Sequence, residues 1–280
     1  MSYIQGMEEK KIQQPITLSD AEAEAYQAYK REKHILEVMN YMQKTVLDAR
    51  GEDVKKLALT AIKHGCAAVK IFPSQLALAR AAIEGSKLKI DCFIGGTGET
   101  FTKAKVYETK LSRRNGAQEI TLLLSENDVK NNRFAEIKKE IKKVCKAAKG
   151  GCVKVCLKET WDNETLIKLC KISFEAGAKL ISVPYFEGCE RLRNDLYLGL
   201  DIEVTNVQTT AILKKMAGAG MQRIQTARLQ SIYDELMLEA ENVMIEQVNT
   251  EEAISKSQDV QQKSPQKKKV QEYKNLISQK

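Results

Sequence analysis

Lys70 is the residue whose setting in this sequence most directly suggests chemistry. It interrupts an apolar run at 67–72 (AAVKIF), which predicts a buried strand that ends at Pro73. Burial disfavours the charged form of an amine, so the pKa of a desolvated lysine falls and its nitrogen becomes nucleophilic. The interpretation that we favour is nevertheless structural, with Lys70 as a rim lysine that is ion-paired with Glu203 or Glu159.

Other residue types that carry chemistry do not assemble into a motif. Seven cysteines lie between residues 66 and 189, most of them inside apolar runs, no CxxC pair occurs, and the chain has two histidines, His34 and His64. This pattern is typical of cysteines that act as small hydrophobic residues in a reducing compartment. A glycine-rich loop at 95–100 (GGTGET) has the composition to cradle an anion, but it matches neither the Walker loop nor the dinucleotide fingerprint. We expect no metal site and no cofactor.

Short apolar strands alternate with helical patterns across the central part of the chain. Strands are predicted at 38–45, 67–72, 89–94, 119–124, 152–157, 179–183, 201–205 and 223–226. Brief, continuous apolar strands are typical of a parallel sheet that is buried on both faces. About eight strand-and-helix units in about 210 residues predict a (β/α)₈ barrel, an α/β fold. A doubly wound open sheet is the alternative.

Composition divides the chain into three parts. Residues 1–34 are polar, and the run 19–33, with Ser19 and Glu22 as a capping box, predicts an arm followed by a helix. Residues 35–248 hold the barrel pattern. Residues 249–280 are rich in Lys, Gln and Ser, which predicts a flexible tail. Within it, 270–277 (VQEYKNLI) has the spacing of a short amphipathic helix for a protein partner, and an inert tail is the alternative.

The net charge of +8 points only weakly to nucleic acid. The last 31 residues hold seven lysines and four acids, and the remaining lysines mostly alternate with acids on predicted helix faces. No nucleic-acid-binding motif accompanies them, so nucleic acid is not favoured as a partner. No run approaches the roughly 20 apolar residues of a membrane helix, and the N-terminus does not read as a signal peptide. We therefore expect a cytoplasmic protein with no membrane association.

Several short phrases, in order, resemble the deoxyribose-phosphate aldolase family of class I aldolases. The matching stretches are 48–49 with 52–57, 65–69 with 73–74, 94–95 with 105–110, 116–120, 154–155 with 159–160, and 175–178. Together they cover roughly residues 38 to 240. The resemblance implies a (β/α)₈ barrel and, in an active member, a lysine that forms a Schiff base with an aldehyde.

Four elements of the family's site are altered in this chain. The family's imine-forming lysine corresponds to Ser182, whose hydroxyl cannot form an imine, and the second lysine, which lowers the pKa of the first, corresponds to Glu203. The family's proton-shuttling aspartate corresponds to Thr121. Where the family has its glycine- and serine-rich phosphate grip, this chain has 225–228 (QTAR). Lys154 matches a lysine that many members carry near the site.

Three hypotheses follow from these differences. The first, which we favour, is a pseudoenzyme: a barrel that binds a ligand or serves as a scaffold or assembly protein, with a protein partner on the N-terminal arm or the C-terminal tail. The second is an active carbon–carbon lyase with a relocated Schiff-base lysine, Lys70 or Lys154. Glu203 or Glu159 would be its acid–base group, and its substrate a different small aldehyde or sugar phosphate. The third is a regulator that binds a sugar phosphate or nucleic acid. The resemblance also implies a homodimer.

Overall fold

The computed structural model describes residues 20–50, 53–158, 160–195 and 199–242. Contacts divide the chain into two units, Ile35–Glu239 and Met1–His34 with Ala240–Lys280. The described part of the second unit, residues 20–34 and 240–242, is helical. The predicted arm before residue 20, the tail at 249–280 and its helix at 270–277 lie outside the described residues, as does Glu159. None of the described helices is long and apolar enough to cross a membrane.

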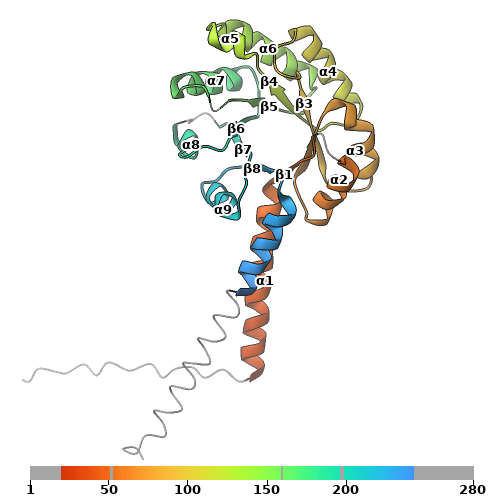
Figure 1. The fold of residues 1–280 in the computed structure, drawn as a ribbon, viewed down its shortest axis with the longest axis vertical. Helices are drawn as coiled ribbons and strands as arrows, with labels where there is room; N and C mark the ends of the chain where they lie inside the picture. The colour runs from red at the N-terminus through yellow and green to blue at the C-terminus, as the bar shows by residue number, and fades with distance from the viewer. Residues whose placement is uncertain (1–19, 51–52, 159, 196–198, 243–280) are drawn as a thin grey trace, which may run out of the picture. The chain divides into compact units, whose positions relative to one another are not determined.

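The first unit contains a closed barrel of eight parallel strands (Figure 1). Each strand pairs with the next one along the chain, and the first and eighth strands pair with each other, Val46 opposite Gln225. The strands are β1 Thr45–Asp48, β2 Ala68–Ile71, β3 Lys89–Ile94, β4 Glu119–Leu123, β5 Cys152–Cys156, β6 Leu180–Pro184, β7 Asp201–Thr205 and β8 Arg223–Thr226. Because the ring closes, the (β/α)₈ prediction is confirmed and the open-sheet alternative is wrong.

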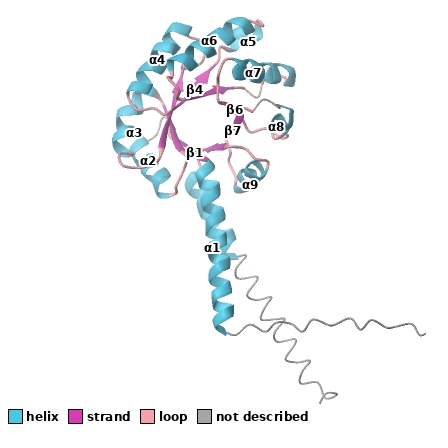
Figure 2. Cartoon of the chain, turned by 180° about the vertical axis from the view of Figure 1, so that it is seen from behind, coloured by secondary structure: helices cyan, strands magenta, loops and turns pink. Residues whose placement is uncertain are grey.

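Helices α2 to α9 lie around the outside of the strands (Figure 2), and α1 precedes β1 in the chain. The helices of the described residues are α1 Asp20–Lys44, α2 Val54–Lys63, α3 Leu76–Ala82, α4 Thr102–Arg114, α5 Glu126–Lys130, α6 Phe134–Ala147, α7 Asn163–Glu175, α8 Arg191–Asp195 and α9 Thr210–Gly218, with a 3₁₀ turn at Pro73–Gln75 and a final helix at 229–242. The helix predicted at 19–33 is present from Asp20 and continues to Lys44. The short helices α5 and α8 follow β4 and β6 and were not predicted.

The predicted first strand at 38–45 is wrong, because residues 38–44 form the last turns of α1. Val38 and Met42, four residues apart, are 4% and 1% exposed, whereas Met39 is 50% exposed. This spacing places one apolar helix face in the core, which a strand with its two-residue period would not do. The strand itself begins at Thr45, directly after the helix.

The barrel strands alternate between two kinds of side chain. Apolar residues such as Val69, Ile120 and Val155 are fully buried, and they flank polar residues that are also buried. The polar set contacts partners from strands that are not neighbours, for example Lys154 of β5 with Glu203 of β7. Such contacts are made only inside the barrel, so the polar residues fill its interior and the apolar ones face the helices.

The β5–α7 connection shows how local sequence sets these elements in place. Asp162 caps α7, because its Oδ1 accepts a hydrogen bond from the Thr165 amide at 2.8 Å. At the other end Gly177 adopts φ +95°, a conformation that favours glycine, and turns the chain into β6. Helix α7 therefore has a defined residue at each of its ends.

Candidate active site inside the barrel

Lys154 is the centre of the buried polar cluster. Its side chain has no exposed surface, and its Nζ lies 2.9 Å from Asp91 Oδ2, 2.8 Å from Glu119 Oε2 and 2.5 Å from Glu203 Oε2. The contacts to Asp91 and Glu203 are hydrogen bonds, and the contact to Glu119 is an ion pair without hydrogen-bond geometry. Three carboxylates therefore converge on one ammonium group.

Glu203 joins both lysines that the sequence singled out. Its Oε2 accepts from Lys154, and its Oε1 accepts from Lys70 Nζ at 2.5 Å and from the Ser182 hydroxyl at 2.9 Å. All of these side chains are buried, with Lys70 at 2% exposure and the others at 0%. The predicted ion pair between Lys70 and Glu203 is present, and Ser182 belongs to the same cluster.

Asp91 on β3 is a member of the cluster that the sequence analysis missed. It is fully buried and lies opposite Lys70 in the β2–β3 register. The Thr121 hydroxyl donates to its two carboxylate oxygens at 2.9 and 3.0 Å. Thr121 thus stands where the resemblance places an aspartate, and the barrel has its buried acid one strand away. A charged residue inside an apolar strand was the available signal, the same one that identified Lys70.

Glu119 completes the cluster toward the start of the strands. It is 3% exposed, and besides Lys154 it lies 3.7 Å from Lys89 Nζ and from Arg223 Nη2. Lys89 is half exposed, so this end of the cluster borders solvent. Since the ions of both signs are interleaved, each buried charge has a partner.

The cluster shifts the pKa values of its members in opposite directions. Burial alone would lower the pKa of Lys154, but Asp91, Glu203 and Glu119 outweigh it and hold this pKa well above the ordinary lysine value. Burial alone would raise the pKa of Glu203, but Lys154 and Lys70 outweigh it and lower that pKa. The pKa of Glu119 is also lowered, because its counter-charges Lys154 and Arg223 outweigh the effect of burial. Lys154 is accordingly an ammonium ion and the two glutamates are carboxylates.

Lys158 lies at the rim of the barrel, apart from the cluster. Its Nζ lies 2.5 Å from Glu126 Oε2, and its side chain is 37% exposed. Lys154, in contrast, lies opposite Thr121 in the β4–β5 register and is fully buried.

A second polar group lies where β1 ends. Arg50 donates from Nε and Nη2 to the two carboxylate oxygens of Asp48, at 2.9 and 2.7 Å, and its guanidinium lies 4.5 Å from the centre of the Phe93 ring. Gln225 donates to the same Asp48 at 2.6 Å and accepts from the Asn206 amide. Gln225, in the segment that replaces the phosphate grip, is thus occupied by contacts within the protein.

The glycine-rich loop at 95–100 is anchored to the start of α5 by its own carboxylate. Glu99 Oε1 accepts from the amide of Glu126 at 2.7 Å and from that of Asn127, at the start of α5, and Oε2 accepts from the Ser125 hydroxyl. Gly98 has φ +96°, and a Cβ there would lie 2.2 Å from the Leu124 carbonyl oxygen. The close approach explains the glycine at position 98, and the hydrogen bonds explain the acidic residue at position 99.

The histidines and cysteines do not join the cluster. His64 Nε2 lies 3.1 Å from Gln230 Oε1 and its ring lies against Tyr233, so this histidine has structural partners. All seven cysteines are free thiols, and burial raises the pKa of Cys66 to about 12. Among the residues that the structure describes, no group of three or more His, Cys, Asp and Glu is arranged to hold a metal ion. At the point where Asp91, Glu119 and Glu203 converge, the Lys154 ammonium group occupies the space that a cation would take.

Comparison with known proteins identifies the family. No family model matches the chain. It is 33% identical over 150 residues to the deoxyribose-phosphate aldolase of Clostridium botulinum (strain ATCC 19397 / Type A), covering 52% of this chain and 71% of that one. It is 29% identical over 213 residues to that of Clostridioides difficile (strain 630), covering 71% and 95%.

Solved structures agree at the level of the fold. The tetrameric deoxyribose phosphate aldolase of Aeropyrum pernix superimposes with a TM-score of 0.65 at 21% identity, covering 75% of this chain and 98% of that one. The aldolase QR15 gives a TM-score of 0.67 at 22% identity, covering 72% and 97%. The sequence matches and the shared fold together show that the chain belongs to the deoxyribose-phosphate aldolase family, as a divergent member.

Proposed function

We propose that this chain is an aldolase-family barrel that has lost Schiff-base aldolase activity and acts as a ligand-binding or assembly protein. The observation that carries the proposal is the Lys154 ammonium, enclosed by three carboxylates within 2.9 Å. An imine forms only when a neutral amine offers its lone pair to a carbonyl carbon. The chain has Ser182 where the family has its imine lysine. The two lysines of the buried cluster, Lys70 and Lys154, are ion-paired.

Lys154 fails both requirements of an imine-forming lysine. Its carboxylate neighbours raise its pKa, which is opposite to the lowering that activates a lysine. Its side chain is also completely buried, so an aldehyde has no approach to its nitrogen without displacing Asp91 or Glu203. Of the two lysines, this one is held more tightly.

Lys70 is closer to the requirements and defines the alternative function. Its nearest carboxylate is Glu203 at 2.5 Å, and the next is Asp91 at 3.6 Å. With fewer counter-charges than Lys154, it is the better candidate for a relocated imine lysine, and Glu203 lies within reach as an acid–base group. In this alternative the chain remains a carbon–carbon lyase for a different small aldehyde or sugar phosphate.

Reductive trapping separates the two functions. The purified full chain is incubated with acetaldehyde and borohydride, and its intact mass is measured beside an active deoxyribose-phosphate aldolase as control. We expect the control to gain the ethyl adduct and this chain to remain unmodified. A stoichiometric adduct that maps to Lys70, and that Lys70→Met abolishes, would establish the alternative and overturn the proposal.

The proposal includes a cytoplasmic location and a homodimer. The seven free thiols favour a reducing compartment, in which cysteines persist unpaired. The related Aeropyrum pernix enzyme is described as a tetramer, so assembly of barrels occurs within the fold. Sedimentation equilibrium of the full chain tests the oligomeric state: twice the chain mass of 31.5 kDa supports the homodimer, and a single chain mass refutes it.

A further inference from the structure

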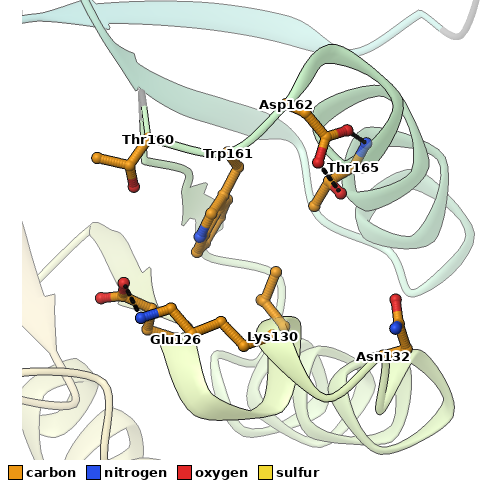
Figure 3. Close-up of a pocket in the computed structure, with 8 residues that line it drawn as sticks. Glu126, Lys130, Asn132, Thr160, Trp161, Asp162 and Thr165 are labelled. Atoms are coloured by element: carbon orange, nitrogen blue, oxygen red, sulfur yellow. Dashed lines mark hydrogen bonds and ion pairs between the residues drawn. The ribbon is translucent and has the colours of Figure 1, made fainter.

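A cavity of about 490 Å³ lies between the segments that follow β4 and β5, outside the buried ionic cluster. Small-molecule sites typically measure roughly 300–1,000 Å³. Figure 3 shows α5 on one side of it and the start of α7 on the other. The residues that the argument uses are Glu126, Lys130, Asn132, Thr160, Trp161 and Asp162.

Trp161 gives this cavity an unsatisfied hydrogen-bond donor. The residue is 8% exposed, and its indole Nε1 has no hydrogen-bond partner. A buried indole N–H usually has one, because leaving the donor unpaired away from water is unfavourable. In Figure 3 the nitrogen is directed toward Glu126 and Lys130 across the cavity. The described part of the chain leaves this donor without a partner.

The charged groups around the cavity neutralise one another. Glu126 lies 3.0 Å from Lys130 Nζ and 2.5 Å from Lys158 Nζ, and these two lysines lower its pKa to about 2. Both carboxylate oxygens of Asp162 accept hydrogen bonds from Thr165, one from its amide at 2.8 Å and one from its hydroxyl at 2.9 Å. Lys158 does not line the cavity but pairs with Glu126, and with it the two carboxylates and two lysines of this group have a formal charge of zero. Glu126 repels an anionic ligand at this position, and the lysines repel a cationic one.

We propose that this cavity binds an uncharged polyhydroxylated ligand, a sugar or a polyol. A hydroxyl accepts from the indole N–H and at the same time donates to the Glu126 carboxylate, which no purely accepting or purely donating group does. The Asn132 amide and the Thr160 hydroxyl offer further donors and acceptors to neighbouring hydroxyls. This site is separate from Lys70 and Lys154, so it stands whether or not the barrel forms an imine.

Access to the indole N–H depends on Lys130. The Nε1 atom has almost no surface of its own, but the Lys130 side chain, which lines the same cavity, is 68% exposed. Exposed side chains exchange rotamers within nanoseconds, so an outward turn of Lys130 opens the donor to a ligand hydroxyl.

Trp161 is the sole tryptophan of the chain, so its indole N–H resonance reports on this site alone. The full chain is labelled with ¹⁵N and titrated with D-glucose, with myo-inositol and, separately, with sodium phosphate. We expect a saturable shift of the indole resonance with at least one of the two polyols and none with phosphate. Saturation with phosphate alone, or no saturable shift with either polyol, would overturn the proposal.

Variants test whether the shift arises from binding at these residues. Calorimetry with the polyol that saturates the resonance is repeated on Trp161→Phe, which keeps the aromatic ring and removes the donor, and on Asn132→Gly. Glycine retains the φ of +55° at position 132 without the amide. Each change is expected to weaken binding by about tenfold, as for the loss of one hydrogen bond. Asn115→Ala, in the groove between α3 and α4, is the control and should bind as the wild type does. Unchanged affinity in both test variants would contradict the assignment.

Discussion

At Glu203 one carboxylate holds together two lysines that would otherwise repel each other inside the barrel. Lys70 and Lys154 each lie 2.5 Å from it, one on each oxygen. In an active family member, the resemblance implies, two lysines in this cavity lower one another's pKa. Here added carboxylates reverse that effect, since Lys154 has a raised pKa. In this chain the region thus favours an ion pair over a neutral amine.

Removal of this carboxylate should destabilise the fold strongly. Glu203→Gln leaves two buried ammonium groups with less counter-charge, and breaking a buried ion pair typically costs about 3–5 kcal/mol. The matched control is Glu175→Gln, which breaks the exposed pair with Lys138. Exposed pairs contribute about 0–1 kcal/mol. Urea unfolding of both variants measures the contrast, and similar losses would show that the cluster is not the stabilising unit described here.

The stability difference between wild type and Glu203→Gln should depend on pH. Because the pKa of Glu203 is lower in the folded state than in the unfolded chain, its contribution is fully present above the ordinary glutamate pKa of about 4.3. It is lost as pH falls from there toward the folded value. Unfolding free energies measured from pH 7 down to acid should converge for the two proteins. A difference that stays constant or widens in acid would contradict the sign of this shift.

The sequence supplied part of this cluster. Lys70 is recognisable as a charged residue within an apolar strand, whereas Lys154 and Glu203 are recognisable from the resemblance to the aldolase family. Asp91 has the same signature in β3 but no counterpart in the resemblance, so it was passed over. What sequence spacing does not specify is which of these strands face one another, and that depends on closure of the barrel. The convergence of three carboxylates on Lys154 was therefore beyond prediction.

At the scale of elements, the spacing of apolar residues along the sequence determines which strands and helices can be predicted. Strands β2 to β8 were recognised from short apolar runs bounded by turns. Residues 38–44 were assigned to a strand although Val38 and Met42 follow a four-residue helical spacing. Helices α5 and α8 span five residues each, too few to show a period. They lie in the connections that follow strands β4 and β6.

The part of α1 from Ile35 onward should contribute to the stability of the barrel unit. Met42 is 1% exposed and belongs to the hydrophobic core, so Met42→Ala is expected to cost about 2–5 kcal/mol. Met39, on the same helix and 50% exposed, is the control, and its change to alanine should stay within about 0.5 kcal/mol. Thermal or urea unfolding of the full chain measures both. Equal effects would mean that this helix face is not part of the core.

At the scale of the whole molecule, this chain has the fold of its family and an interior that differs from the site that the resemblance implies. The closed barrel and the matches to deoxyribose-phosphate aldolases show descent within one family. The interior, however, carries Ser182, Glu203 and Thr121 where the resemblance implies two lysines and an aspartate. A barrel supports many chemistries on one scaffold, so the scaffold can persist after its reaction is lost.

Turnover of the family substrate tests the central claim most directly. Acetaldehyde release from 2-deoxyribose 5-phosphate is followed for the full chain, for its Lys70→Met and Lys154→Met variants, and for an active family member. We expect the wild-type rate to equal the rate without protein, and the active enzyme to cleave the substrate in the same assay. A rate above background that either lysine substitution abolishes would show that the barrel is a working aldolase.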